Sequence, residues 1–147
     1  MTYLEKARSI LLREHYRLVL CGEDATYFDT RRGVAPLLAL LDDGAEVTGF
    51  AAADRVVGKA AAFLYLRLGV TAVYAQVISD SALALLTDHG VEVEVETVVP
   101  QIRNRAGDGY CPMETVCLPL ADPVEAEQAV RRRLAQMKQS QNKEKSI

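Results

Sequence analysis

Hydrophobic residues recur along the chain with two different spacings. In the first segment they repeat every three or four positions, at Leu4, Ala7, Ile10 and Leu11, which predicts one apolar face of a helix. Two short apolar runs then flank a Gly-Glu-Asp turn and predict a β-hairpin. The elements expected in this part are a helix over 3–14, strands over 17–22 and 25–30, and a second helix over 34–41.

The middle of the chain shows the longest helical pattern. The run D-R-V-V-G-K-A-A-A-F-L-Y-L-R-L-G predicts one helix that begins at an N-cap, Asp54, and ends at Gly69. A buried strand over 71–78, a helix over 79–90 and a strictly alternating strand over 91–99 are expected next. Because strand, helix and strand follow one another, they predict a crossover between parallel strands.

The last third begins with a polar loop over 101–113. A strand is predicted near 115–120, and Asp122 then provides the N-cap of a final helix. The segment 139–147 has no apolar spacing and is expected to be disordered. Since the pattern contains no internal repeat and no domain boundary, residues 1–138 are predicted to form one α/β domain.

Composition narrows the class of protein. Half of the 147 residues are hydrophobic and a quarter are charged, which is typical of a globular domain that buries its own core. The net charge of -3 and the pI near 5.4 argue against a broad nucleic-acid surface, which needs clustered basic residues. No apolar segment is long enough to span a bilayer, and the N-terminus lacks the layout of a signal peptide. We therefore expect a cytoplasmic protein without membrane or nucleic-acid partners.

The cysteines do not predict a metal site. Cys21, Cys111 and Cys117 are an odd number in a chain without an export signal, so free thiols are expected. Five residues separate Cys111 from Cys117, whereas zinc ligands usually come from a shorter C-x2-4-C turn and a second pair. We expect neither a metal nor a cofactor, and we expect Cys21 and Cys117 to be core thiols.

Lys59 lies in a run, A-D-R-V-V-G-K-A over 53–60, that resembles the end of a phosphate-binding P-loop. The run lacks the first glycine of that motif and the hydroxyl residue after the lysine, so a nucleotide triphosphatase is not predicted. Two interpretations of Lys59 remain. It is either an anion ligand near the positive end of a helix or a surface lysine whose stem covers apolar side chains.

The segment 101–114 gathers the densest set of polar side chains in the chain. Its arginines suit a grip on phosphate or carboxylate, and its glycines allow turns that bring backbone amides close to a ligand. The other interpretation is a solvated connection in which Asp108 makes an ordinary turn. A cysteine becomes a nucleophile where a nearby cation favours its thiolate, and the arginines or Lys59 would supply that cation for Cys111.

Two longer strings carry a resemblance to a known family. A-D-R-V-V-G-K-A-A-A and V-V-P-Q-I-R-N-R-A-G-D-G-Y-C-P-M-E are similar to a small bacterial domain family of unknown function that has a cytidine-deaminase-like fold. The resemblance covers about 18–120. It implies a three-layer α/β/α architecture in which a mixed sheet carries helices on both faces.

The same resemblance bears on the site. Deaminases of that superfamily bind zinc through H-x-E and P-C-x-x-C strings, and this chain has neither, so hydrolytic deamination by a zinc-bound water is excluded. The fold still implies a pocket where two helix N-termini converge beneath the 101–114 segment, and their positive dipole ends favour an anion. The residues expected to line this pocket are Asp54, Lys59, Ser79, Asp80, Arg103, Asn104, Arg105, Cys111 and Glu114.

Three functions remain open at this point. The first is a protein that binds a small anionic or nucleotide-like molecule through Lys59, Ser79, Asp80, Arg103, Asn104 and Arg105. The second is an enzyme whose Cys111 attacks an electrophilic carbon while Glu114 or Asp54 handles protons. The third is an interaction module that assembles through an apolar patch. A homodimer is compatible with all three.

Overall fold

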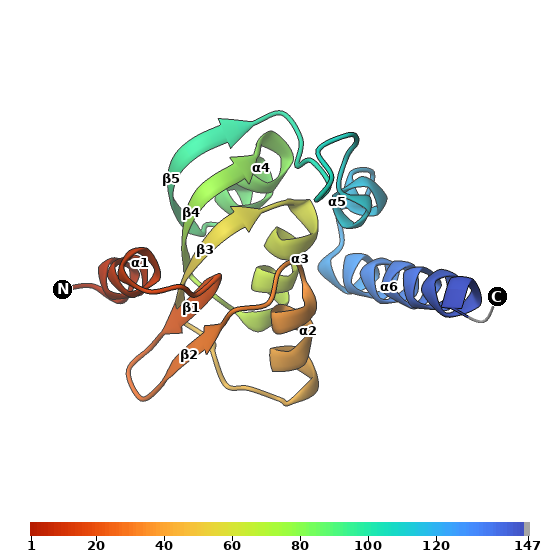
Figure 1. Cartoon of the computed structure of the whole chain (residues 1–147). Helices are drawn as coiled ribbons and strands as arrows, with labels where there is room; N and C mark the ends of the chain where they lie inside the picture. The colour runs from red at the N-terminus through yellow and green to blue at the C-terminus, as the bar shows by residue number, and fades with distance from the viewer. Residues whose placement is uncertain (146–147) are drawn as a thin grey trace.

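The computed structural model describes residues 1–145, which form a single five-stranded sheet with helices on both faces (Figure 1). In chain order the elements are α1 (Tyr3–Arg13), β1 (Leu18–Cys21), β2 (Thr26–Asp29), α2 (Ala35–Asp42), β3 (Ala51–Val57), α3 (Lys59–Leu68), β4 (Ala72–Ser79), α4 (Asp80–Asp88), β5 (Glu92–Val99), α5 (Pro112–Cys117) and α6 (Pro123–Lys145).

The strands are arranged in the order β2-β1-β3-β4-β5. β1 is antiparallel to β2 and to β3, whereas β3, β4 and β5 run parallel to one another. The predicted hairpin and the predicted parallel crossover are therefore confirmed. This topology brings the ends of β2, β3, β4 and β5 to one edge of the sheet, together with the start of β1. We call this the carboxyl edge.

Two hydrophobic clusters hold the layers together. On one face, Leu4, Ala7 and Leu11 of α1 pack against Val19 and Tyr74 of the sheet. On the other face, a larger cluster joins the sheet to α2, α3 and α4 and extends to α5 and α6. A mixed sheet with helices on both faces is the α/β class that the sequence predicts, so that prediction is confirmed.

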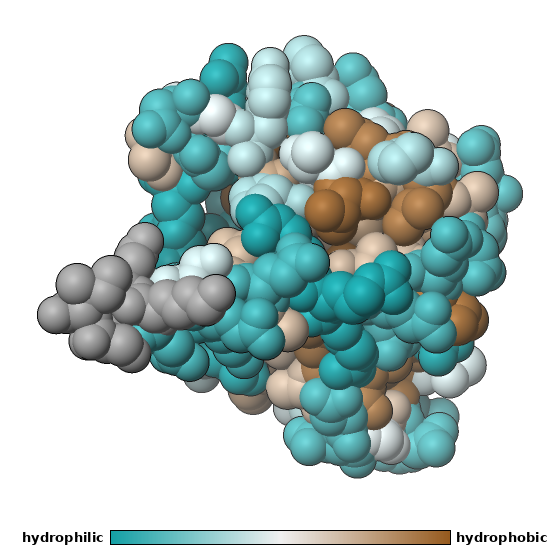
Figure 2. All heavy atoms as spheres, turned by 90° about the vertical axis from the view of Figure 1, so that its right-hand side faces the viewer, coloured by the Kyte–Doolittle hydropathy of each residue, from teal (hydrophilic) through white to brown (hydrophobic). Residues whose placement is uncertain are grey.

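The side of the molecule that carries α5 and α6 is mostly hydrophilic (Figure 2). Figure 2 also shows a group of hydrophobic residues on this side. Two large apolar side chains are accessible here, Leu118 at the C-terminal end of α5 at 37% and Val124 in the first turn of α6 at 45%. Isolated apolar side chains at a surface are common in soluble domains and need no partner to explain them.

β3 and α3 replace the single helix predicted from Asp54 to Gly69. The chain is strand as far as Val57, Gly58 is the N-cap, and α3 begins at Lys59. The reason is the position of β3 between β1 and β4, where strand pairing satisfies its backbone N–H and C=O groups on both sides. The prediction that Asp54 is a helix N-cap is wrong, because Asp54 lies within β3.

The C-terminal part differs from the prediction in two further ways. The strand predicted near 115–120 is wrong, because this region includes a short helix, α5, with Pro112 at its first turn. β5 is the outer strand of the sheet, and no further strand pairs with it within residues 1–145. α6 continues through the segment expected to be disordered as far as Lys145, and residues 146–147 of that segment lie outside the described part.

Candidate functional site

The carboxyl edge collects most of the predicted site residues. Ser79 and Asp80 join β4 to α4, Asp54 lies near the end of β3, and the loop over 100–111 follows β5. Ligands of open α/β sheets commonly bind outside the carboxyl ends of the strands. In this chain the edge divides into two parts, one around Glu114 and one around Asp54.

Glu114 is a carboxylate enclosed between helices, and it is only 1% exposed. Its Oε1 accepts a hydrogen bond of 3.1 Å from the hydroxyl of Ser81, in the first turn of α4. Its Oε2 accepts one of 3.2 Å from the backbone N–H of Ile102, in the loop after β5. One side chain of α5 therefore ties together α4, the loop and α5 itself.

Gly58 allows Glu114 to approach the start of α3. A Cβ atom on Gly58 would lie 2.6 Å from Oε2 of Glu114 and 3.2 Å from Cγ1 of Ile102. Helix N-termini favour negative charge, and here the chain itself supplies that charge. The carboxylate of Glu114 thus occupies the region between the helix N-termini in which the sequence analysis expects an anionic ligand.

Lys59 and Ser79 make contacts within the fold. The Nζ of Lys59 donates a hydrogen bond of 2.7 Å to the carbonyl oxygen of Leu118, at the C-terminal end of α5. Ser79 is fully buried as the N-cap of α4, and its hydroxyl oxygen accepts a hydrogen bond of 3.3 Å from the N–H of Ala82. Asp80 is exposed in the first turn of α4. Lys59 and Ser79 therefore use their polar atoms in contacts that hold α5 and α4.

Cys111 differs from the other two cysteines because it is partly exposed, whereas Cys21 and Cys117 are buried. It is the N-cap of α5, and Cys117 is the last residue of that helix. Burial raises the pKa of the Cys117 thiol to about 11, and the nearby positive charge of Lys59 opposes this shift. The expectation of buried thiols at Cys21 and Cys117 is confirmed, although Cys117 lies in a helix rather than a strand.

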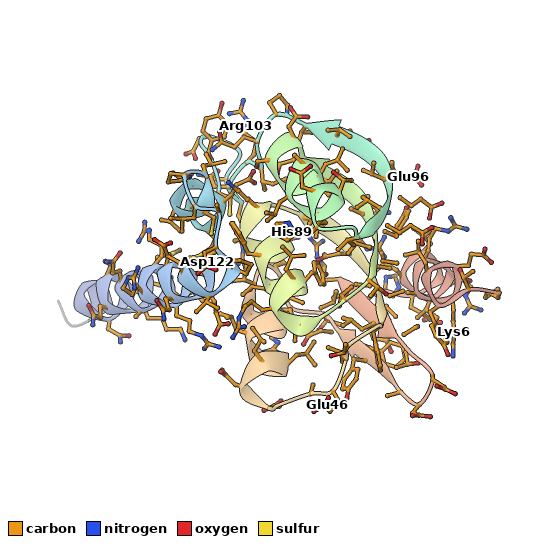
Figure 3. All side chains as sticks on the ribbon, turned by 180° about the vertical axis from the view of Figure 1, so that it is seen from behind. Lys6, Glu46, His89, Glu96, Arg103 and Asp122 are labelled. Atoms are coloured by element: carbon orange, nitrogen blue, oxygen red, sulfur yellow. The ribbon has the colours of Figure 1, made fainter. Side chains whose placement is uncertain are left out.

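The loop after β5 is organised by contacts among its own residues. Arg103 lies over the ring of Tyr110, 5.0 Å from its centre, and the side-chain amide of Asn104 donates a hydrogen bond of 3.0 Å to Asp108. The Oδ1 atom of Asn104 is buried and has no hydrogen-bond partner among the described residues. Figure 3 shows Arg103 at the same end of the molecule as α5 and far from Lys6 of α1.

Asp54 forms the second part of the edge together with Tyr65, a fully buried residue of α3. The Tyr65 hydroxyl donates a hydrogen bond of 2.6 Å to Oδ2 of Asp54. Burial raises the pKa of the Asp54 carboxyl to about 6, against the opposing effects of the Tyr65 hydrogen bond and of Arg17. Burial and the neighbouring Asp54 also raise the pKa of Tyr65 well above its ordinary value. A partly buried carboxyl with a raised pKa in such a position is a functional-site candidate.

Arg17 brings several positive charges close to Asp54. Its backbone N–H donates to the carbonyl of Asp29, and its own carbonyl accepts from the N–H of Arg55, so it lies between the ends of β2 and β3. Burial lowers the pKa of Arg17, the charges of Arg32, Arg55 and Arg105 lower it further, and Asp54 opposes them. Arg32, Arg55 and Arg105, from three other segments, therefore each lie within electrostatic reach of Arg17.

These arginines are not equally free to bind a ligand. The guanidinium of Arg55 donates to backbone carbonyls at the end of α1, including that of Tyr16 at 3.1 Å. In the part of the chain that the structure describes, Arg17, Arg32 and Arg105 form no ion pair. Arg17, Arg32 and Arg105 are thus without an ion-pair partner among the described residues, and Arg17 lies close to the carboxyl group of Asp54.

Three members of this group, Arg17, Arg32 and Tyr65, were not predicted from the sequence. Arg17 and Arg32 lie in loops, Arg32 directly after Arg31, and Tyr65 lies in an apolar helical run. The feature of the sequence that could have pointed to a site was the position of these residues next to the ends of predicted strands. That signal becomes informative only with the strand order, because the order decides which strand ends share an edge.

The family assignment follows from comparison with known proteins. The family model described as "TM1506: Domain of unknown function (DUF1893)" matches residues 6–134. The chain belongs to this family. A crystal structure of a DUF1893 family protein (TM1506) from Thermotoga maritima is similar, with a TM-score of 0.78 and 26% identity over 91% of this chain and 89% of the other. None of the curated proteins matches the chain.

The described part of the DUF1893 chain contains neither a metal-binding cluster nor a helix able to span a membrane. Within residues 1–145, no group of three or more His, Cys, Asp or Glu side chains is placed to hold a metal ion. None of the helices in that range combines the length and apolar character needed to cross a membrane.

Proposed function

We propose that this DUF1893 protein binds a small anionic ligand at the carboxyl edge and that Arg17, Arg32 and Arg105 hold its negative charge. The observation that carries the proposal is that Arg32 and Arg105 each lie close enough to Arg17 to lower its pKa, while none of the three forms an ion pair in the described part of the chain. Like charges repel, so such a grouping is costly unless an anion compensates it. Guanidinium groups suit phosphate and carboxylate because they donate two hydrogen bonds in parallel.

The proposal moves the expected ligand away from the two helix N-termini. Glu114 already provides a negative charge there, with donors from Ser81 and Ile102. A second anion beside that carboxylate would be repelled. Arg105 belongs to the same segment as the predicted binding residues Arg103 and Asn104, so the loop after β5 still contributes to the ligand site.

In this proposal, the resemblance to cytidine-deaminase-like proteins concerns the fold and not the chemistry of the site. The mixed sheet with helices on both faces supports that resemblance. The chain lacks the H-x-E and P-C-x-x-C strings, and Ser79, Asp80 and Ser81 at the start of α4 include neither a thiol nor an imidazole. We therefore propose binding, and not zinc-dependent deamination, as the function of this site.

The test compares anions at constant ionic strength. Sodium sulfate, sodium pyrophosphate and nucleoside monophosphates are titrated into the protein, with sodium chloride as reference, and binding is followed by calorimetry and by thermal unfolding. An anion at about 100 times its Kd should stabilise the native state by about 2.7 kcal/mol. Sulfate and pyrophosphate report simple charge recognition, whereas tighter binding of the nucleotides alone would identify a nucleotide site.

Three variants test which arginines bind the anion. Arg105→Ala and Arg32→Ala each remove one exposed guanidinium group and should weaken binding of the effective anion at least about tenfold, since each charge-assisted hydrogen bond contributes roughly 1.5 kcal/mol or more. Arg132→Ala removes an exposed arginine of α6 and is the matched control. The proposal is wrong if no anion stabilises the wild type, or if all three variants bind like the wild type.

A Cys111-dependent enzyme is the second candidate, and one observation favours it. Cys111 is partly exposed at the start of α5, while both other cysteines are buried. Glu114 is already hydrogen-bonded to Ser81 and Ile102, which gives it a structural role in place of proton transfer. If a substrate is found, Cys111→Ser should abolish turnover and Arg105→Ala should not; the opposite result would favour the anion site.

A further inference from the structure

β5 leaves one of its two edges unpaired in the described part of the chain. It pairs with β4 along its length, and no strand lies on its other side within residues 1–145. The N–H of Glu92 donates a hydrogen bond of 3.0 Å to the carbonyl oxygen of Thr71, so the backbone groups of Glu92 face β4. Because the direction of these groups alternates along a strand, those of Val93 and Val95 face away from the sheet. Such an edge can pair with a further strand.

Three glutamates, Glu92, Glu94 and Glu96, lie on one face of β5 because they alternate along the strand. Glu94 forms an ion pair with Arg8 of α1, and Glu96 accepts a hydrogen bond of 3.1 Å from the hydroxyl of Tyr74. Figure 3 shows Glu96 on the side of the sheet that carries α1. Among the described residues, neither Glu92 nor Glu96 forms an ion pair, so this face of β5 keeps a negative charge.

The helix on this side of the sheet does not cover β5. The hydrophobic cluster beneath α1 contains residues of β1, β3 and β4 and none of β5 among the described residues. On the opposite face of β5, Val93 and Val95 pack against the larger cluster, and Val98 is 44% exposed. A strand added to β5 would therefore meet carboxylates on one face and apolar side chains on the other.

Independently of the proposed anion site, we infer that the open edge of β5 binds an extended segment of a partner protein in which lysine or arginine alternates with apolar residues. The backbone groups of Val93 and Val95 pair with those of the segment. Its basic side chains lie beside Glu92 and Glu96, and its apolar side chains lie on the opposite face. In strand addition of this kind, the main chain supplies affinity and the alternate side chains supply specificity.

A second copy of this chain fits the edge less well. Two β5 strands related by a twofold axis perpendicular to the sheet run antiparallel and place the glutamates of both copies on the same face. Like charges opposite each other on neighbouring strands are destabilising. The glutamates that attract a basic segment therefore also keep two copies from pairing through this edge.

The experiment uses a synthetic peptide of about eight residues that alternates lysine with valine and has blocked ends. Binding to the full chain is followed by calorimetry at about 50 mM salt, where surface charges are only partly screened. The alternating peptide should bind at least about tenfold more tightly than a scrambled peptide of the same composition or a peptide with glutamate in place of lysine. Hydrogen exchange of the Val93 and Val95 amides should slow when the alternating peptide is added.

Backbone pairing is tested with two N-methylated forms of the alternating peptide. One carries methyl groups on the amides of its valines and the other on those of its lysines. Only one of these two sets of amides faces β5 in an added strand, so one form should lose binding and the other should keep it. This comparison uses the wild-type protein and needs no variant.

The charge requirement is tested with two double variants. Glu92→Lys with Glu96→Lys reverses the free carboxylates of β5 and should weaken binding of the alternating peptide at least about tenfold. Glu23→Lys with Glu125→Lys makes the same change of charge at exposed glutamates outside β5 and should bind like the wild type.

Several outcomes would overturn the inference. They are no binding of the alternating peptide, equal binding of the scrambled peptide, or equal binding of both N-methylated forms. Equal weakening by both double variants would mean that the peptide responds only to net charge. A dimer in sedimentation experiments that is altered by the β5 double variant and not by the control would assign the edge to a second copy. None of these results bears on anion binding, so the proposed function is tested separately.

Discussion

The hydroxyl of Tyr65 donates a hydrogen bond of 2.6 Å to Oδ2 of Asp54, eleven residues earlier in the chain. α3 runs back along the sheet after the turn at Gly58, which brings Tyr65 over β3. Burial at this location disfavours the ionised form of the Asp54 carboxyl group. The hydrogen bond from Tyr65 offsets part of that cost. This pair ties α3 to β3 beside the arginines.

Asp54→Asn should stabilise the protein at neutral and alkaline pH. The folded-state pKa of Asp54 is about 6, raised from 3.8 by burial, so between these values the native state binds more protons than the unfolded state. The contribution to stability is complete below about pH 4 and is lost as the pH rises through about 6. Chemical denaturation at about pH 8 should show Asp54→Asn to be more stable than the wild type by about 2 to 3 kcal/mol.

The same comparison at about pH 4 gives the control, because most of the difference between Asp54→Asn and the wild type should have disappeared there. An unfolding free energy for Asp54→Asn below that of the wild type at about pH 8 would show that the ionised carboxylate stabilises the fold, contrary to this account.

Tyr65→Phe should destabilise the protein and raise the pKa of Asp54 further. The variant removes the donor from a buried carboxyl group, which costs about 1.5 to 3 kcal/mol when the acceptor is ionised and less when it is protonated. The loss should therefore be larger at about pH 8 than at about pH 5. Tyr27→Phe serves as the control, because the hydroxyl of Tyr27 makes no hydrogen bond within the described part of the chain. Equal losses at both pH values would contradict the assigned role of Tyr65.

Gly58→Ala should disturb the position of Glu114. The new Cβ would lie 2.6 Å from Oε2 of Glu114, which is closer than atoms can approach, so the carboxylate must move and loses its hydrogen bonds to Ser81 and Ile102. We expect a loss of about 1 to 3 kcal/mol in the free energy of unfolding.

A double-mutant cycle with Glu114→Ala tests this explanation. Glu114→Ala alone leaves the donors of Ser81 and Ile102 unpaired and should cost about 2 to 4 kcal/mol. In that background Gly58→Ala should cost little, because the atoms it would strike are absent. Glu23→Ala, at an exposed glutamate, controls for the loss of a carboxylate. If Gly58→Ala costs as much without Glu114 as with it, the close approach is not the cause.

Cys111 should be the first cysteine to be alkylated in the native protein. It is partly exposed, whereas Cys117 is fully buried and its thiol pKa is raised to about 11 by that burial. Iodoacetamide labelling followed by mass spectrometry at about pH 8 should modify Cys111 alone, with Cys21 and Cys117 reacting only after unfolding. Native labelling of Cys117 at a comparable rate would mean that α5 opens readily.

Much of the fold could be predicted from local patterns. The hairpin of β1 and β2 and the crossover from β4 through α4 to β5 were expected, because alternation and turn residues mark them directly. β3 was missed because its run of alanines and the aspartate at position 54 are typical of a helix start. Pairing with strands on both sides outweighed this local preference.

The sequence by itself determined the class of the domain, the burial of Cys21 and Cys117 and the absence of the zinc-binding strings. These depend on composition, spacing and residue type, which are local properties. Only the tertiary structure decided that Glu114 fills the region between the helix N-termini and that Arg17 lies near Asp54, with Arg32 and Arg105 within its electrostatic reach. The reason is that strand order and direction decide which loops share an edge, and residues far apart in the chain meet only once the sheet has formed.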